Sequence, residues 1–354
     1  MNNIPEKKNL DIGFMPLTDC LPLVVGKEKG FFSAQGLDVR LHKQNSWATL
    51  RDKVHSGYLD AAQMLAPMPI ASHLGIGVDA TAMKVPFVLS YNGNGVTLSN
   101  RLLDEMFGAD QNAQAVALQE PLSAALLKPI IETRRSKAQK KLIFATVFHF
   151  SHHFYQLQSW LAQAEITASD VDVLVIPPTD MVPALASNDI DGFCVGSPWN
   201  AAAVRQQLGA TVTTSNDLWP KMPEKVLGMT AKWQQQHPNT LKALLIGLEQ
   251  AVNWLDSIPN RFEGARILAK QQYLNVSLDV VTPALLNSCL TSNTDNPRLV
   301  PQYIEFLDQQ HGNRPQLTQG RWTMQHMITA AHINLDTNMD EVVNNIYSAS
   351  ADRV

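Results

Sequence analysis

The stretch that decides the fold is residues 45–69, NSWATLRDKVHSGYLDAAQMLAPMP. Ser46 is a favourable N-cap residue, so a short helix is expected over residues 48–56, with Trp47 at the first helical position. Gly57 suits the left-handed conformation that commonly ends a helix. Trp47 is therefore predicted to face whatever lies over the N-terminus of this helix.

The second half of the stretch adds a strand and another helix start. Small and apolar residues over 59–65 predict a buried strand. Pro67 and Pro69 follow it and favour the first turn of a helix. An aromatic side chain and two helix N-termini are thus expected near one end of a sheet. Unpaired N–H groups converge there, and small anions bind to such places.

The flanking sequence continues the alternation of strands and helices. Because this pattern is typical of parallel sheets with helices on both faces, an α/β fold is expected. The predicted strands are residues 10–15, 37–42, 59–65, 85–91, 142–147, 171–176, 190–195 and 211–215. The predicted helices of the first two thirds are residues 21–34, 69–74, 101–141, 152–164, 178–187 and 198–208. The predicted helices of the last third are residues 239–257, 261–273, 278–290, 301–310, 318–331 and 339–348.

Two places predict that the chain crosses between lobes. Residues 92–95, Asn-Gly-Asn-Gly, form a break with two glycines, and the extended residues 211–215 suit the return crossing. With 354 residues and 45% hydrophobic content, two lobes are expected. Residues 1–91 and 215–354 would form a discontinuous first lobe, and residues 92–214 a continuous second lobe, with a ligand cleft between them.

Composition argues against several classes of partner. The net charge is −4 and charged residues make up 17% of the chain, so direct binding of nucleic acid is not expected. Cys20, Cys194 and Cys289 are widely spaced in the sequence. They are therefore expected to be buried free thiols, which fits a reducing compartment.

The N-terminal segment bears on localisation. Residues 1–10, MNNIPEKKNL, contain no apolar run typical of a signal peptide, and Cys20 lacks the apolar upstream region of a lipoprotein cysteine. No stretch has the ~18 uninterrupted apolar residues of a membrane span. A cytoplasmic protein without a membrane partner is therefore predicted; a trimmed signal peptide is the alternative.

Several linked motifs resemble one family, the nitrate- and bicarbonate-binding proteins of the periplasmic-binding-protein superfamily. The motifs occur in the family's order and spacing over about residues 9–230. They are Leu17-Thr18-Asp19-Cys20, Lys27-Glu28-Lys29-Gly30-Phe31-Phe32, Ser46-Trp47, Leu59-Asp60-Ala61-Ala62, Ala66-Pro67-Met68-Pro69, IDGFCVGSPWN at 190–200, and Pro223-Glu224-Lys225. The resemblance implies a two-lobe, type II periplasmic-binding-protein-like fold, each lobe a mostly parallel sheet flanked by helices.

The resemblance also implies a site for a small anion. Trp47, Asn94, His153 and Lys225 match the family's anion-binding positions, and Gly196 would let backbone N–H groups approach. Trp47 would offer an indole N–H and a flat wall, Asn94 an amide where a glutamine is expected, and Lys225 the charge. His153 falls at a helix N-terminus, where the helix dipole favours a bound anion.

Each of these residues also has an ordinary structural interpretation. Taken alone, Trp47 is more often a packing residue, His153 a structural histidine and Lys225 a surface lysine. A metal site at His149, His152 and His153 is disfavoured because no cysteine or carboxylate set accompanies them. No metal and no cofactor are expected.

The chemistry of the ligand sets requirements for the site. Nitrate accepts hydrogen bonds on all three oxygens, so donors and one positive charge are expected, and a carboxylate would be repelled. Bicarbonate would need an acceptor, and in this family its binding is associated with a cation, which Lys225 would repel. Nitrate and nitrite are therefore favoured. Ser197 replaces an expected glutamate, which leaves the detailed geometry open.

Three functions from different classes follow. Because a signal peptide is not expected, the favoured function is that of the family's cytoplasmic members, a nitrate/nitrite sensor; the resemblance implies that it releases an RNA-binding antiterminator partner when the anion binds. The alternative is the substrate-binding subunit of a nitrate or bicarbonate ABC transporter. An enzyme on this fold, similar to pyrimidine-precursor synthases, is disfavoured because no Ser-His or Cys-His arrangement suggests a nucleophile.

Overall fold

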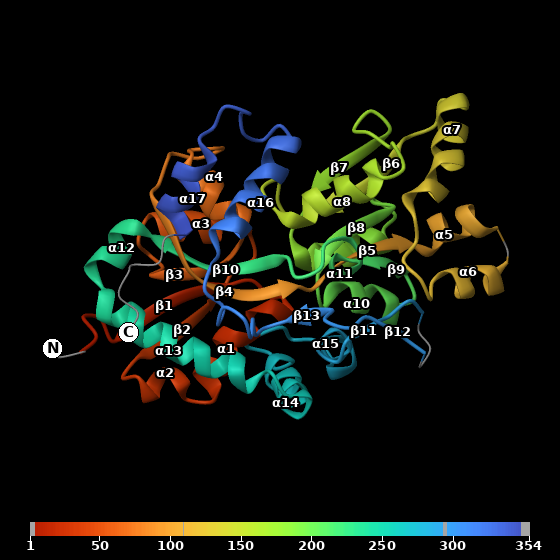
Figure 1. Cartoon of the computed structure of the whole chain (residues 1–354). Coiled ribbons are helices and arrows are strands. Elements are labelled where there is room, and N and C mark those ends of the chain that lie inside the picture. The colour runs from red at the N-terminus through yellow and green to blue at the C-terminus, as the bar shows by residue number, and fades with distance from the viewer. Residues whose placement is uncertain (1–3, 109, 293–295, 348–354) are drawn as a thin grey trace.

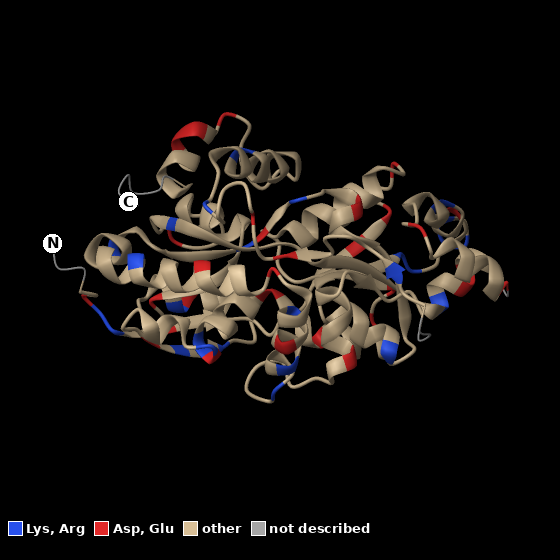
Figure 2. Ribbon diagram, turned by 60° about the horizontal axis from the view of Figure 1, so that its bottom comes forward, with Lys and Arg blue, Asp and Glu red and all other residues tan. Residues whose placement is uncertain are grey.

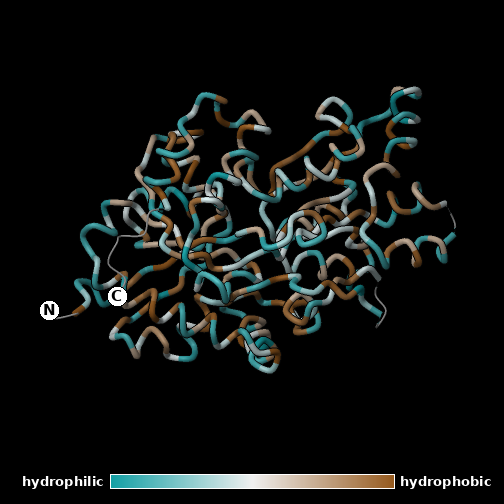
Figure 3. Tube along the Cα trace, in the orientation of Figure 1, coloured by the Kyte–Doolittle hydropathy of each residue, from teal (hydrophilic) through white to brown (hydrophobic). Residues whose placement is uncertain are grey.

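The computed structural model describes residues 4–108, 110–292 and 296–347. In it two β-sheets lie side by side, each at the centre of one lobe (Figure 1). Hydrophobic segments run through the interior of both lobes, and many of the outer turns are hydrophilic (Figure 3). Each sheet is therefore the core of its lobe.

The first sheet is built from β1 (Asn9–Phe14), β2 (Asp38–Lys43), β3 (Ala61–Leu65), β4 (Met83–Asn92), β10 (Pro223–Thr230) and β13 (Ile304–Glu305). Its strand order is β13-β4-β10-β3-β1-β2. β1 pairs in parallel with β2 and β3, whereas β10 pairs antiparallel with β3 and β4. β1 to β4 thus share one direction and β10 opposes them.

The second sheet is built from β5 (Asn94–Ser99), β6 (Leu142–Thr146), β7 (Val171–Val175), β8 (Gly192–Gly196) and β9 (Gly209–Thr214). Its order is β7-β6-β8-β5-β9. β6 is parallel to β7 and β8, and β5 is antiparallel to β8 and β9. The directions are again mostly parallel, with one strand opposed.

Helices cover both faces of the first sheet. One face packs against α1 (Leu21–Glu28), α2 (Phe31–Ala34), α13 (Pro238–Trp254) and α14 (Ile258–Leu268). The other face packs against α3 (Trp47–His55), α4 (Pro67–His73), α16 (Leu317–Thr329) and α17 (Met339–Tyr347). The second of these hydrophobic clusters continues into strands and helices of the second lobe, so the two lobes are packed together.

The second lobe carries its own helices. They are α5 (Asn100–Phe107), α6 (Gln111–Ala117), α7 (Lys128–Ser136), α8 (His152–Ala162), α9 (Met181–Ala186), α10 (Trp199–Arg205) and α11 (Ser215–Leu218). α15 (Leu278–Leu285), from late in the chain, packs on α10, with the small β11 (Ser288–Cys289) and β12 (Arg298–Leu299) hairpin beside it (Figure 1). α12 (Ala231–Gln236) follows β10.

The chain passes between the sheets at two places. Gly93, with φ +97°, separates β4 from β5, and α11 lies between β9 and β10. β5 and β10 are the first strands after the two crossings. Each pairs antiparallel with the neighbouring strands of the sheet that the chain has just entered. The lobe boundaries proposed at residues 91/92 and 214/215 stay predictions of where the hinges lie.

Replacing Gly93 with alanine is expected to destabilise the protein by about 1–2 kcal/mol, the cost of a positive φ for a residue with a Cβ. A Cβ at Gly93 would also lie 3.1 Å from Cδ1 of Ile304. Thermal unfolding measures the effect. Gly36→Ala is the matched control for the contact with Ile304. Gly36 also has a positive φ, +76°, but no described atom lies within 4 Å of its Cβ position, so this variant shows the cost of the backbone conformation alone. Equal stability of Gly93→Ala and wild type would show that this crossing is unstrained.

Some predicted elements are wrong. The expected helix at 301–310 is irregular because Gln302 has φ +61° and residues 304–305 pair with β4 as β13. The expected helix at 21–34 is divided at Gly30, which has φ +76°. Among the described residues, the polar helix expected over 101–141 is divided into α5, α6, a short 3-10 helix at Ala124–Leu127 and α7. The strand β10 was not foreseen. Ser348, the expected end of the last helix, lies outside the described residues.

The surface and the cysteines match simple expectations. Acidic and basic segments are interspersed over the outer helices (Figure 2). Cys20, Cys194 and Cys289 are free and buried, as the spacing suggested. Within the described ranges, no helix is long and apolar enough to cross a membrane.

Candidate functional site

The five residues predicted for the anion site are all buried where the lobes meet. Trp47 begins α3, Asn94 begins β5, His153 is in the first turn of α8, Gly196 ends β8 and Lys225 lies in β10. Trp47 is 2% exposed, and Asn94, His153 and Lys225 are fully buried. Residues from both lobes therefore converge on one enclosed region.

Lys225 is the centre of this region. Its Nζ lies 2.8 Å from Oδ2 of Asp19 and 2.8 Å from Oε1 of Glu224. Burial lowers the pKa of Lys225, but the charges of Asp19 and Glu224 outweigh burial and raise it. Lys225 is thus an ammonium held between two carboxylates.

An irregularity in β10 makes this arrangement possible. Glu224 and Lys225 are consecutive, and consecutive side chains of a strand normally point to opposite faces. The pairing of β10 with β4 shifts register on both sides of Lys225. Such a bulge redirects one side chain, so both charged groups reach the space between the lobes.

The two carboxyl groups respond differently to burial. Burial raises the pKa of Asp19, and the opposing effect of Lys225 only partly offsets this increase. Burial also raises the pKa of Glu224, but Lys225 and the neighbouring histidines outweigh it and hold the pKa well below its usual range. Asp19 is consequently the carboxyl group that accepts a proton more readily.

Trp47 supplies an indole N–H with no partner among the described residues. Ser46 caps α3 as predicted, its Oγ accepting from the backbone N–H of Thr49 at 3.4 Å. Nζ of Lys225 lies 5.8 Å from the centre of the Trp47 ring. Nε1 of Trp47 is buried and makes no hydrogen bond within the described chain. A buried donor without a partner is costly, so this atom is suited to a ligand.

His153 lies beside the same charges. Ser151 caps α8 by accepting from the N–H of Phe154, and Nδ1 of His153 lies 3.4 Å from Oε1 of Glu224. Burial lowers the pKa of His153 to about 3, against the opposing charge of Glu224. His153 is therefore neutral near pH 7, one of its ring nitrogens donates, and neither has a hydrogen bond to a described residue.

Asn94 and Gly196 form the side of the site that belongs to the second lobe. Nδ2 of Asn94 donates to Oε1 of Gln156 at 3.0 Å, and Oδ1 of Asn94 has no partner in the described chain. A Cβ on Gly196 would lie 3.4 Å from that Oδ1 and 3.5 Å from Oδ2 of Asp19. Asn94 therefore presents its oxygen, Oδ1, to this region as an acceptor without a described partner.

Further buried polar atoms near these residues lack partners in the described parts of the chain. They belong to Thr18 (Oγ1), Thr146 (Oγ1), His152 (Nδ1), Asn200 (Oδ1) and Glu224 (Oε2). Of these, Nδ1 of His152 and Oε2 of Glu224 lie 3.6 Å apart, too far for a hydrogen bond. Buried polar groups in proteins are usually hydrogen-bonded. The unsatisfied atoms of Trp47 and Glu224, which contact Lys225 directly, indicate a place suited to a small polar ligand.

The expectation that the site excludes carboxylates is wrong. Asp19 and Glu224 both contact Lys225, so the cluster of these three residues carries a net charge of −1 when both carboxyl groups are ionised. The argument that Lys225 repels a cation fails for the same reason. Asp19, Glu224 and His152 were missed as site residues, although Asp19 and Glu224 stand within the motifs that carried the resemblance.

Ser197 has a clear structural role. Its Oγ and its backbone N–H both donate to the carbonyl oxygen of Gly93, at 3.1 and 2.9 Å. Its own carbonyl oxygen accepts from the N–H of Thr18 at 2.7 Å. Ser197 therefore ties the crossing at Gly93 to both lobes, and its hydroxyl is occupied by that contact.

His149, His152 and His153, the histidines considered as metal ligands in the sequence, do not form one cluster. His149 is exposed and packs edge-on against Phe154, whereas His152 and His153 are buried. In the described ranges, no group of three or more His, Cys, Asp or Glu side chains is placed to hold a metal ion.

Helix α16 connects the site with the outer part of the first lobe. Nε2 of His152 lies 3.3 Å from Oγ1 of Thr323 in α16. The Tyr155 hydroxyl lies 3.0 Å from Nδ1 of His332, just beyond the same helix. Both contacts join α8 of the second lobe to the first lobe, so they help to hold the two lobes together.

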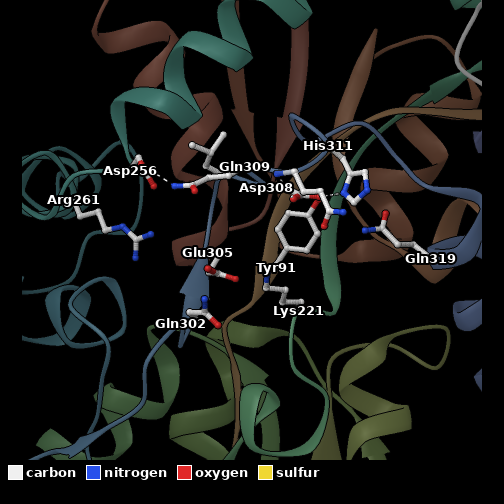
Figure 4. A pocket seen from close by; sticks show the side chains of 12 residues that line it. Tyr91, Lys221, Asp256, Arg261, Gln302, Glu305, Asp308, Gln309, His311 and Gln319 are labelled. Carbon is white, nitrogen blue, oxygen red and sulfur yellow. Dashed lines mark hydrogen bonds and ion pairs between the residues drawn. The ribbon is translucent and has the colours of Figure 1, made fainter.

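A separate pocket of about 370 Å³ lies next to the crossing strands (Figure 4). Tyr91, Lys221, Glu305 and Asp308 line it, and Figure 4 shows Lys221 and Glu305 near the Tyr91 ring. None of the five predicted site residues lines this pocket. Its mixed charges and its opening to solvent make it a poorer match to a small anion than the enclosed lysine.

Comparison with known proteins shows which family the chain belongs to. Residues 3–269 match the model of the NMT1-like family. The chain is 34% identical over 344 residues to the nitrate import ATP-binding protein NrtC of Synechocystis sp., covering 96% of this chain and 49% of that protein. It is 29% identical over 349 residues to the nitrate/nitrite binding protein NrtA of Nostoc sp., covering 96% and 75%. The chain spans about half the length of the first curated relatives it matches.

A solved structure confirms the fold. The crystal structure of the periplasmic nitrate-binding protein NrtA from Synechocystis PCC 6803 matches with a TM-score of 0.87 and 28% identity. The match covers 97% of this chain and 86% of that one. The α/β, periplasmic-binding-protein-like fold expected from the sequence is therefore confirmed.

Proposed function

Because the chain belongs to the NMT1-like family and its relatives include nitrate- and bicarbonate-binding proteins, we propose that it binds a small planar oxyanion, nitrate or nitrite, between its lobes. The family resemblance in the sequence motifs is confirmed at this level. The observation that carries the proposal is Lys225, fully buried beside the unpartnered N–H groups of Trp47 and His153.

The three oxygens of nitrate match the groups around Lys225. Lys225 provides a charge-assisted donor, Trp47 a fixed indole N–H and His153 a ring N–H from the opposite lobe. Hydrogen bonds to an ionised partner are the strongest of their kind in proteins. Because the donors come from both lobes, the anion would favour the closed arrangement over an open one.

Isothermal titration calorimetry with nitrate, nitrite, bicarbonate and sulfate tests this proposal. Nitrate and nitrite are expected to bind at one site. Sulfate is expected not to bind, because a second negative charge beside Asp19 and Glu224 would be repelled. Bicarbonate binding tighter than nitrate binding, or no binding of any of the four, would contradict the proposal.

The cellular role is a finer part of the proposal. A substrate-binding subunit of an ABC importer is the role that the names of the relatives support better, since they are import and binding proteins. The sensor that holds an RNA-binding antiterminator in the cytoplasm remains a second proposal.

Two measurements distinguish these roles. Size-exclusion chromatography of the protein with the antiterminator regulator, with and without nitrate, tests the sensor: a complex that forms and dissociates on adding nitrate supports it. Nitrate-dependent stimulation of the ATPase of a reconstituted importer supports the transport role. A regulator complex that survives saturating nitrate and nitrite unchanged would end the sensor proposal.

A further inference from the structure

The charges around Lys225 pose a problem for anion binding. One ammonium, of Lys225, faces two carboxylates, of Asp19 and Glu224, and all three groups are at least 98% buried. An entering anion would add another negative charge to a cluster that is already net negative. Burying an uncompensated charge is strongly unfavourable. A positive charge must therefore enter the site together with the anion.

Several other ionisable groups face the cluster. They are His152 and His153 on α8, Cys194 on β8, Cys20 beside Asp19, and His326 on α16 next to His152. The two thiols, His153 and His326 do not supply this charge. Burial raises the pKa of both thiols, which stay neutral. Burial lowers the pKa of His153 and of His326, so these imidazoles are also neutral near pH 7.

We propose that the anion binds together with one proton, and that Asp19 takes up this proton. The inference rests on the proposed anion site. The anion competes with Asp19 for the ammonium of Lys225, and Asp19 then loses the charge that stabilised its ionised form. Protonation makes Asp19 neutral and converts its Oδ2 from an acceptor into a donor.

The surroundings of Asp19 fit this change. Oδ1 of Asp19 accepts a short hydrogen bond from Nε2 of Gln63, at 2.5 Å, which a protonated carboxyl group retains. Oδ2 lies 3.5 Å from the Cβ position of Gly196, next to the unpartnered Oδ1 of Asn94. A proton on Oδ2 would thus meet either the anion or an available acceptor. Glu224 is less suited, because two histidines and Lys225 stabilise its charge.

A metal cation is the other possible source of positive charge. Among the described residues, no group of three or more His, Cys, Asp or Glu side chains is arranged to hold one. The ammonium of Lys225 already lies between the two carboxylates, at 2.8 Å from each. A proton needs no such space, so it is the counter-charge that this geometry favours.

Proton uptake by the unmodified protein tests the inference. Nitrate is added to the protein in weakly buffered solution, and base or acid consumption is followed with a pH electrode. We expect uptake of about one proton per nitrate bound near pH 7, with the dissociation constant rising about tenfold per pH unit between pH 6 and 8. Binding with no proton uptake and a dissociation constant independent of pH would overturn the inference but not the proposed function. Absence of all anion binding would overturn both.

Two variants locate the proton. Asp19→Asn should bind nitrate without proton uptake and with a flat pH profile. Asp60→Asn is the matched control, because Asp60 is a buried carboxylate paired with Lys7 at 2.6 Å, and it should keep the wild-type profile. Full proton uptake in Asp19→Asn would overturn the assignment to Asp19. If Asp19→Asn does not fold, the measurement on the unmodified protein still decides whether a proton is taken up.

Repeating the same titration with added calcium chloride distinguishes a proton from a metal cation as the positive charge that enters with the anion. Proton uptake and nitrate affinity that are unchanged by calcium support the inference. Tighter nitrate binding with calcium, accompanied by loss of proton uptake, would overturn it in favour of a cation that enters with the anion.

Discussion

Lys225→Met is expected to lose anion binding and about 3–5 kcal/mol of folding stability, because removing one partner of a buried ion pair leaves an uncompensated charge. Here the loss leaves Asp19 and Glu224 facing each other without the ammonium that lies 2.8 Å from both. The lost charge-assisted hydrogen bond to the anion alone is worth about 1.5–3 kcal/mol. Thermal unfolding and nitrate calorimetry measure the two effects.

Two further variants separate stability from binding. Combining Lys225→Met with Asp19→Asn and Glu224→Gln removes all three charges, so stability should largely return while nitrate binding stays lost. Lys29→Met is the control for removing a lysine: its partner Glu263 lies 3.0 Å away on the surface, and such pairs contribute about 0–1 kcal/mol. Wild-type nitrate affinity in Lys225→Met would remove Lys225 from the site.

Trp47→Phe is expected to weaken nitrate binding by about 1.5–3 kcal/mol, or roughly 10- to 100-fold, with little loss of stability. Phenylalanine retains much of the buried ring surface and removes only the indole N–H, which has no partner in the described chain. The folded protein without ligand therefore loses no hydrogen bond. Calorimetry gives the affinity, and the change in tryptophan fluorescence on adding nitrate should shrink in the variant.

Trp160→Phe is the matched control, and the opposite result is expected for it. Trp160 is equally buried, but its Nε1 donates to the carbonyl oxygen of Leu122 at 2.8 Å. Its replacement should lower stability and leave nitrate affinity unchanged. If Trp47→Phe bound nitrate as tightly as the wild type, Trp47 would be a packing residue and would not contact the anion.

Local sequence patterns predicted much of the fold. Ser46 predicted the start of α3 and the apolar residues after Gly57 predicted β3, because capping and burial depend on side chains within a few residues. β10 and β13 were missed for the opposite reason. Each forms where a distant strand offers hydrogen bonds, and Gln302, with φ +61°, prevents the helix that the local pattern favoured.

Resemblance in the motifs placed five residues together, and the structure brings them into one buried region. It did not predict the electrostatics of that region. Asp19 lies far from Lys225 in the sequence, and Glu224 directly precedes it. Neither position indicated a contact, since neighbouring strand residues normally diverge. The register shifts in β10 and the packing of the lobes created both ion pairs.

The sequence by itself determined the α/β class, the alternation of elements, the buried cysteines and the family, because each depends on local periodicity or on linked motifs. The tertiary structure alone decided which strands oppose their neighbours, where Asp19 and Glu224 lie and how Lys225 is charged. These properties depend on contacts between residues far apart in the chain, and on the low dielectric that arises only when both lobes close around the same groups.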